Sequence, residues 1–200
     1  MPNWCWNKLD ISGPSEDIQK FKVTANGPVQ SYHDYHGERT GGKWPIHDDV
    51  RLKALAESLP EPGEVSVLSF HALFPVPDEV RQLPYDGNRA KEVADTLGRT
   101  LTNSGYSWEI ENWGCKWGCT EPELQVEEDS FLGYSFETAW APPMAFLAKV
   151  AGDWPELCFE LHYEEAGMGF AGDAEFYSGE LQSDNAYDLP AEEDEDDCDE

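Results

Sequence analysis

Apolar and polar residues alternate with a period of two near the start of the chain, which predicts a strand over residues 4–12. The odd positions from Cys5 to Ile11 share one face, and the even positions, which include two tryptophans, share the other. A glycine-proline pair then ends the strand. A helix with a short apolar face is expected from Ser15 onward, because acidic residues suit a first helical turn.

Several later stretches also favour strands. The most regular is 157–165, whose odd positions are apolar, and a glycine turn after it leads to a returning strand, so the pair is read as a terminal hairpin. In 131–140 the even positions, which end at Trp140, share a face. Both faces of 65–74 are mostly apolar, which is typical of a central strand. These later strands are expected over 65–74, 124–128, 131–140, 157–165 and 170–181.

Helical spacing of apolar residues recurs between the strands. The segment 26–45 shows neither period and is interpreted as a loop. It contains His33 and His36, a spacing that can hold a metal on one helix face. No helical pattern or third ligand accompanies them, so a loop with incidental histidines is favoured. Further helices are expected over 47–59, 88–102 and 144–151.

The order of these elements predicts an α+β fold. Two strand-helix-strand units in one chain suit a ferredoxin-like, split β-α-β sandwich, with an antiparallel sheet and helices on one face. We expect one domain over residues 1–181, with insertions at about 26–64 and 78–112 and a terminal hairpin. Residues 182–200 offer almost nothing to bury, and 191–200 alone carry eight carboxylates. A disordered acidic tail is therefore expected from residue 182.

The net charge of −28 is distributed unevenly along the chain. Residues 1–100 carry 11 basic and 15 acidic side chains, whereas 101–200 carry 2 basic and 26 acidic ones. Such a surface repels phosphate backbones and anionic membranes, so direct nucleic-acid and membrane binding are disfavoured. A basic or nucleic-acid-binding protein partner fits the charge better. Solubility alone is the other explanation for the acidity.

Composition places few limits on the cellular context. No apolar run is long enough to span a bilayer, and the first residues lack the charged start and apolar centre of a signal peptide, so a cytoplasmic protein is expected. The five cysteines are odd in number, which makes a disulfide framework a poor fit. Two pairs of potential zinc ligands, each spaced four residues apart, make a zinc site conceivable, but idle or buried thiols are favoured. Those two pairs are Cys115 with Cys119 and Cys158 with His162.

Tryptophans concentrate in residues 108–117, where three of the eight lie, and Lys116 lies among them. Large aromatic side chains beside a lysine can form a binding surface, since tryptophan is favoured at interaction hot spots. They can equally fill the core. The candidate surface also includes carboxylates that face outward from the segment 157–165. The simplest interpretation of Glu160, Glu164, Glu165 and His162, however, is a solvated face. The candidate interaction surface is Trp113, Lys116, Trp117, Trp140, Glu160 and Glu164.

Five blocks of the sequence resemble the YubB-type proteins of phages and conjugative plasmids. They are the Met1–Gly13 opening and four later blocks, namely Leu68–Pro77, Trp113–Trp117, Phe136–Pro143 and Tyr163–Gly167. The resemblance implies a ferredoxin-like domain without an iron–sulfur cluster. It implies no activity, because that family is a domain of unknown function.

Three functional hypotheses follow. The first is a non-catalytic module of mobile-element origin that presents an acidic and aromatic surface to a host protein, with no cofactor or metal. In its sharper form the carboxylates mimic phosphates and block a DNA- or RNA-binding host protein. The second is a nucleic-acid-processing enzyme whose metal is held by carboxylates. The third is a structural accessory domain.

Overall fold

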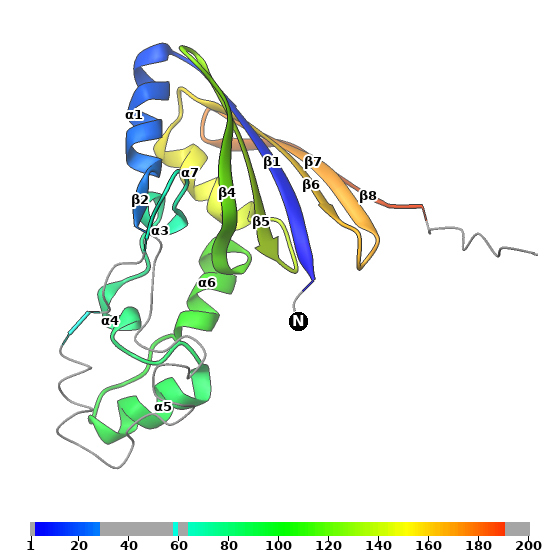
Figure 1. The fold of residues 1–200 in the computed structure, drawn as a ribbon. Helices are drawn as coiled ribbons and strands as arrows, with labels where there is room; N and C mark the ends of the chain where they lie inside the picture. The colour runs from blue at the N-terminus through cyan, green and yellow to red at the C-terminus, as the bar shows by residue number, and fades with distance from the viewer. Residues whose placement is uncertain (1–2, 29–57, 60–63, 191–200) are drawn as a thin grey trace, which may run out of the picture.

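The computed structural model describes residues 3–28, 58–59 and 64–190. Strands and helices follow one another in the order shown in Figure 1. The strands are β1 (Trp4–Ser12), β2 (Gly27–Pro28), β3 (Val65–Ser66), β4 (Lys116–Glu128), β5 (Phe131–Ala139), β6 (Cys158–Glu165), β7 (Phe170–Tyr177) and β8 (Glu180–Asp188). The helices are α1 (Ser15–Ala25), α3 (Phe70–Leu73), α4 (Asp78–Arg81), α5 (Gly87–Thr96), α6 (Gly105–Trp113) and α7 (Met144–Asp153).

A six-stranded antiparallel sheet organises the molecule. Its order is β4-β5-β1-β6-β7-β8, so the first strand lies near the centre and pairs with both β5 and β6. Helix α1 follows β1, α7 connects β5 to β6, and both helices cover the same face of the sheet (Figure 1). The predicted α+β fold, an antiparallel sheet with helices on one face, is confirmed. Among the described residues, no helix covers the opposite face (Figure 1).

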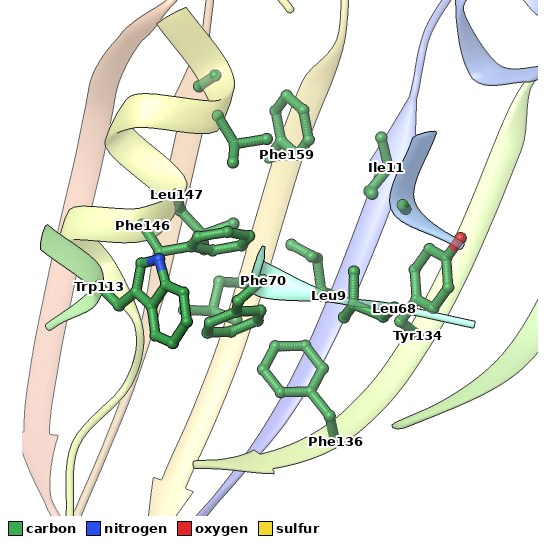
Figure 2. Packing of buried hydrophobic residues seen from close by; sticks show 14 of the residues in the cluster. Leu9, Ile11, Leu68, Phe70, Trp113, Tyr134, Phe136, Phe146, Leu147 and Phe159 are labelled. Atoms are coloured by element: carbon green, nitrogen blue, oxygen red, sulfur yellow. The ribbon is translucent and has the colours of Figure 1, made fainter. Parts of the chain in front are cut away.

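The core lies between this sheet and its helices, and alternation along β1 explains why. Its odd positions, such as Leu9 and Ile11, are buried, whereas its even positions face outward. Figure 2 shows aromatic rings from separate helices and strands, among them Phe70, Phe136 and Phe146, meeting in this layer. Phe70 stacks on Phe146 with ring centroids 3.8 Å apart and meets Trp113 edge-on. Each fully buried side chain of this kind contributes about 2 to 3 kcal/mol relative to exposure.

The strand predicted over 65–74 was wrong. Only Val65–Ser66 of this segment forms a strand, and Phe70–Leu73 forms the short helix α3. The hydroxyl of Ser69 caps that helix by accepting the backbone N–H of Ala72. Periodicity cannot separate a short apolar run in a strand from one in a buried helix.

The tryptophan-rich stretch contains a helix that the pattern did not reveal. Ser104 caps α6 through the backbone N–H of Ser107, and Gly114 ends it in the left-handed region with φ of 82°. The helix predicted over 88–102 ends earlier, since α5 stops at Thr96. The helix predicted over 47–59 lies almost wholly outside the described residues, as do His33 and His36.

Two predictions near the sheet edges also need correction. Residues 182–188 were assigned to a disordered tail, but they form most of the edge strand β8, which pairs with β7 along its length. Backbone pairing orders this strand although its side chains are exposed on both faces. Trp140 was expected to be the last residue of the strand predicted over 131–140 and to share a face with its even positions, but β5 ends at Ala139. Trp140 then turns outward with φ of 73° and is 43% exposed.

Candidate interaction surface

The face of the sheet opposite α1 and α7 is called the open face here (Figure 1). Trp6 and Lys8 of β1 project from it and are exposed. Directly paired residues on neighbouring strands point to the same side, so the pairing register identifies the other side chains of this face. Its acidic members include Asp10, Glu123, Glu137, Glu160, Glu164, Asp173 and Glu175.

A row of three carboxylates crosses the middle of the open face. Asp10 of β1 is paired with Glu160 of β6, which is paired with Glu175 of β7. Like charges directly opposite one another on neighbouring strands are destabilising. Lys8 partly offsets this by an ion pair with Asp10, at 2.6 Å from Nζ to Oδ2. We call Asp10, Glu160 and Glu175 the carboxylate row.

Two shallow hollows flank β1 on this face. One, of about 380 Å³, lies over β1, β6 and β7 and is lined by the carboxylate row together with His162. The His162 Nδ1 atom lies 2.8 Å from the carboxylate of Asp173. The other hollow, of about 550 Å³, lies over β4, β5 and β1, and Trp6 forms part of its lining. Lys8 and Asp10 border both hollows, so the two hollows are neighbours on the open face.

Aromatic residues gather at the end of the open face nearest the N-terminus. The Nζ atom of Lys116 lies 3.9 Å from the ring centroid of Trp117 and 5.9 Å from that of Trp140. The ring of Trp4 lies 6.3 Å from that of Trp117. The register places Lys116 and Trp4 on either side of Ala139. We call Trp4, Lys116, Trp117 and Trp140 the aromatic end.

The backbone of the aromatic end is strained and firmly anchored. Trp117 and Trp140 have φ of 70° and 73°, a region that costs bulky residues of order 1 to 3 kcal/mol each. The N–H of Trp117 donates to the carboxylate of Glu109 at 2.6 Å, and the N–H of Trp140 donates to the carbonyl of Asn3 at 3.0 Å. Glu109 is fully buried and also accepts the hydroxyl of Tyr85 at 2.7 Å.

The structure separates the sequence-predicted site residues into three groups. Lys116, Trp117 and Trp140 come together at the aromatic end. Glu160 and Glu164 lie on the open face, the latter beside Trp6. Trp113 does not join either group: it is 1% exposed and donates its indole N–H to the carbonyl of Phe74, so it belongs to the core.

The cysteines do not assemble the conceivable zinc site. Cys115 and Cys119 lie against the core, whereas Cys158 and His162 belong to the open face. Burial raises the pKa of the Cys115 thiol well above its usual range and that of Cys119 to about 12, which keeps both protonated. Among the described residues, a different set converges, because Cys158, Glu160 and Glu175 bring potential ligand atoms within 4.8 Å.

His71, the histidine of the segment expected to be a central strand, has a structural role. Its Nδ1 atom accepts the backbone N–H of Val76 at 3.0 Å. Burial, reinforced by the nearby Arg81 guanidinium, lowers the pKa of His71 to about 4. The imidazole is therefore neutral at physiological pH, as its acceptor role requires.

Sequence reasoning missed Trp4, Trp6 and Asp10 as members of this surface, and it missed Glu109 as the buried anchor of Trp117. Alternation along β1 placed the first three on one face, so two tryptophans on the outward side of one strand could have indicated a binding surface. The structure shows that both tryptophans are exposed. No local pattern marks Glu109, because its partners lie 24 residues before it and 8 residues after it. Within the described residues, no helix is long and apolar enough to cross a bilayer.

Comparison with known proteins identifies the same kind of domain. Residues 121–200 match the family model described as "Ferredoxin-like domain in Api92-like protein". A curated relative, the uncharacterized protein YubB of Escherichia coli (strain K12), is 30% identical over 79 residues. That alignment spans 39% of this chain and 54% of YubB, about half of the relative's length. The resemblance to YubB-type proteins is thus supported for the domain family.

A solved structure extends the likeness to nearly the whole chain. The crystal structure of protein Api92 from Yersinia pseudotuberculosis superimposes with a TM-score of 0.62, covering 96% of this chain and 99% of the other. Sequence identity is 10%, so this comparison concerns the fold alone. The matched family segment includes β8 and the acidic residues that follow it.

Proposed function

We propose that this protein is a non-catalytic binding module whose open face takes up a basic segment of another protein. The carboxylate row carries this proposal. Three carboxylates opposed on neighbouring strands cost stability in the free protein. A sheet with a purely structural role gains nothing from this placement, whereas lysine or arginine side chains of a partner would relieve the repulsion.

The surroundings of the carboxylate row suit such a partner. The row lines a hollow rather than a bulge, so cationic side chains can lie between carboxylates with partial exclusion of water. Trp4 and Trp6, at 38% and 42% exposure, offer ring faces to a guanidinium group. The net charge of −28 also steers a basic partner toward the molecule and accelerates association at low salt.

The finer form of the proposal is a mobile-element protein that mimics nucleic acid toward a host protein. Carboxylates across the sheet recur at about 4.8 Å between strands and at about 6.7 Å along a strand. A regular array of negative charges is what a phosphate-binding surface recognises. The likeness to YubB supports this context only at the level of the domain.

The test is capture of basic host proteins by the intact chain and by Glu160→Gln/Glu175→Gln. The matched control is Glu79→Gln/Glu92→Gln, which removes the same charge from exposed helical positions. We expect the open-face variant alone to lose the partner. Binding should weaken steeply with salt and compete with DNA. Binding that is insensitive to salt, or equal loss in both variants, contradicts the proposal.

Truncation separates the folded domain from the acidic residues after it. A chain ending at Leu181 would remove most of β8, so the cut belongs after Pro190, beyond the hydrogen bond from the N–H of Leu189 to the carbonyl of Gly169. We expect residues 1–190 to keep the partner. Loss of the partner from a folded 1–190 chain would move the function to residues 191–200.

A second candidate is a metal-dependent nucleic-acid-processing enzyme, favoured by the convergence of Cys158, Glu160 and Glu175. One thiol and two carboxylates suit zinc or manganese. Calorimetric titration with each metal, followed by cleavage assays on single- and double-stranded DNA, tests it. Cys158→Ser serves as the comparison. Absence of both metal uptake and cleavage would exclude this function and, if no partner binds either, leave a structural accessory domain.

A further inference from the structure

Lys116 is an unusual cation in this molecule. Of the thirteen lysines and arginines, it is one of two in the second half of the chain. The other, Lys149, is ion-paired with Asp153 on α7. Within the part of the chain that the structure describes, no ion pair includes Lys116. Its ammonium group lies over aromatic rings instead. The carboxylates of the described residues thus leave this cation without an ion-pair partner.

Lys116 also lines a hollow of about 260 Å³ with apolar walls. The hollow lies between α6 and the turn that follows β5, and the side chains around it are 43% to 47% exposed at Tyr106, Ile110 and Trp140. The small residues Gly114, Ala139 and Ala141 complete the lining. Exposed apolar side chains that gather around one charged group are typical of a ligand site.

The walls of this hollow are held in place before any ligand arrives. Trp140 keeps its left-handed backbone through the carbonyl of Asn3, and Trp117, on which the lysine lies, is held by buried Glu109. Such anchored strain is characteristic of ligand clamps. Preorganised walls lose little side-chain entropy on binding, so the affinity of a matching group is increased.

We propose that this hollow binds the C-terminal residue of the partner segment, with its apolar side chain against Tyr106, Ile110 and Trp140 and its carboxylate on Lys116. The Lys116 ammonium group, which has no ion-pair partner among the described residues, selects a carboxylate. The apolar walls select an apolar side chain. A single hollow of this size takes one residue. Within a polypeptide, only a C-terminal residue combines an apolar side chain with a carboxylate. Aspartate and glutamate side chains carry a carboxylate but lack the apolar group.

The inference rests on the proposed function and adds the direction in which the partner segment would run along the open face. From Trp4 at the aromatic end to Asp10 in the carboxylate row, β1 rises six residues, or about 20 Å. A partner bound along the open face would therefore place basic residues over the carboxylate row and end with an apolar residue about six positions later. The acidic middle and the cationic end together fix its direction.

The test uses four synthetic peptides of about ten residues, sized to that span. The first carries arginines in its first half and ends in leucine with a free carboxylate. The second is its C-terminal amide. The third replaces the arginines by glutamine, and the fourth is an amide whose last residue is aspartate. Calorimetry measures each against the intact protein and against Lys116→Met, with Lys149→Met as the control and thermal unfolding as the check on folding.

We expect the free acid to bind the intact protein and Lys149→Met about tenfold more tightly than the amide. In Lys116→Met the two should bind equally. Equal binding of acid and amide to the intact protein overturns the inference, as does retention of the preference in folded Lys116→Met. Tight binding of the aspartate amide assigns the hollow to a side-chain carboxylate and also overturns it. If arginine and glutamine peptides bind equally, or none binds, the proposed basic partner fails instead.

Discussion

The carboxylate row and the aromatic end occupy one face of the same sheet but depend on the fold in opposite ways. Asp10, Glu160 and Glu175 project from regular strands, where Glu160 is exposed and Asp10 and Glu175 are half-buried. Trp117 and Trp140 have strained backbones, and the anchor of Trp117 lies inside the protein. The charges can be changed with little effect on stability, whereas the tryptophans are coupled to the core. Substitutions should therefore separate the roles of the two regions.

The largest expected effect is that of Trp113→Ala, which removes the core support beneath the aromatic end. Trp113 is fully buried and contacts Phe70 and Trp108, so its loss leaves a large cavity and should cost about 3 to 5 kcal/mol. Urea denaturation measures the change. Trp140→Ala, at an exposed position, should cost about 1 kcal/mol or less. Similar losses in the two variants would contradict the assignment of Trp113 to the core.

Glu109→Ala should have the next largest effect. It removes the acceptor of the Trp117 N–H and of the Tyr85 hydroxyl in a buried site. Loss of about 3 kcal/mol is expected, because unsatisfied buried donors cost about 1 to 3 kcal/mol each. The matched control is Glu111→Ala on the same helix, where the side chain is exposed and the change should stay within about 0.5 kcal/mol. Equal stability of both variants would show that Trp117 needs no anchor.

His71 links the support of the aromatic end to pH. The pKa of His71 is about 4 in the folded protein, below the usual 6.5. Between pH 4 and 6.5 the unfolded chain therefore binds more protons at this residue than the folded protein does. The stability that neutral His71 contributes is complete above about pH 6.5 and is lost as the pH falls toward 4. His71→Asn, which keeps an acceptor for the Val76 N–H, should flatten this part of the stability profile. Urea midpoints from pH 4 to 7 measure the difference, and parallel profiles would contradict the prediction.

The smallest expected effect on stability, with the opposite sign, is that of Glu160→Gln/Glu175→Gln. Neutralising two members of the carboxylate row removes cross-strand repulsion and should stabilise the free protein by about 0.2 to 1 kcal/mol at low salt. The gain should shrink as salt is added. The same urea experiment at low and high salt measures it. Destabilisation at low salt would show that these carboxylates support the fold, and the contrast with the aromatic end would disappear.

Some of this surface was accessible from local patterns and some was not. The alternation that buries Leu9 and Ile11 also exposes Trp6 and Lys8, so one side of β1 was predictable. The pattern could not show that Glu160 and Glu175 lie beside Asp10, because cross-strand register depends on the whole sheet. The density of tryptophans suggested a site but could not distinguish buried Trp113 from exposed Trp140.

The sequence alone determined the elements in which period and side-chain chemistry agree. Those are β1, α1, α7 and the β6–β7 hairpin, where each residue's place follows from its neighbours a few positions away. Only the tertiary structure decided the helical state of Phe70, the strand at residues 182–188, and the meeting of Glu109 with Trp117. These depend on a buried ring stack, on backbone pairing and on a hydrogen bond from a helix side chain to the backbone of the following strand. None of these contacts leaves a periodic trace in the chain.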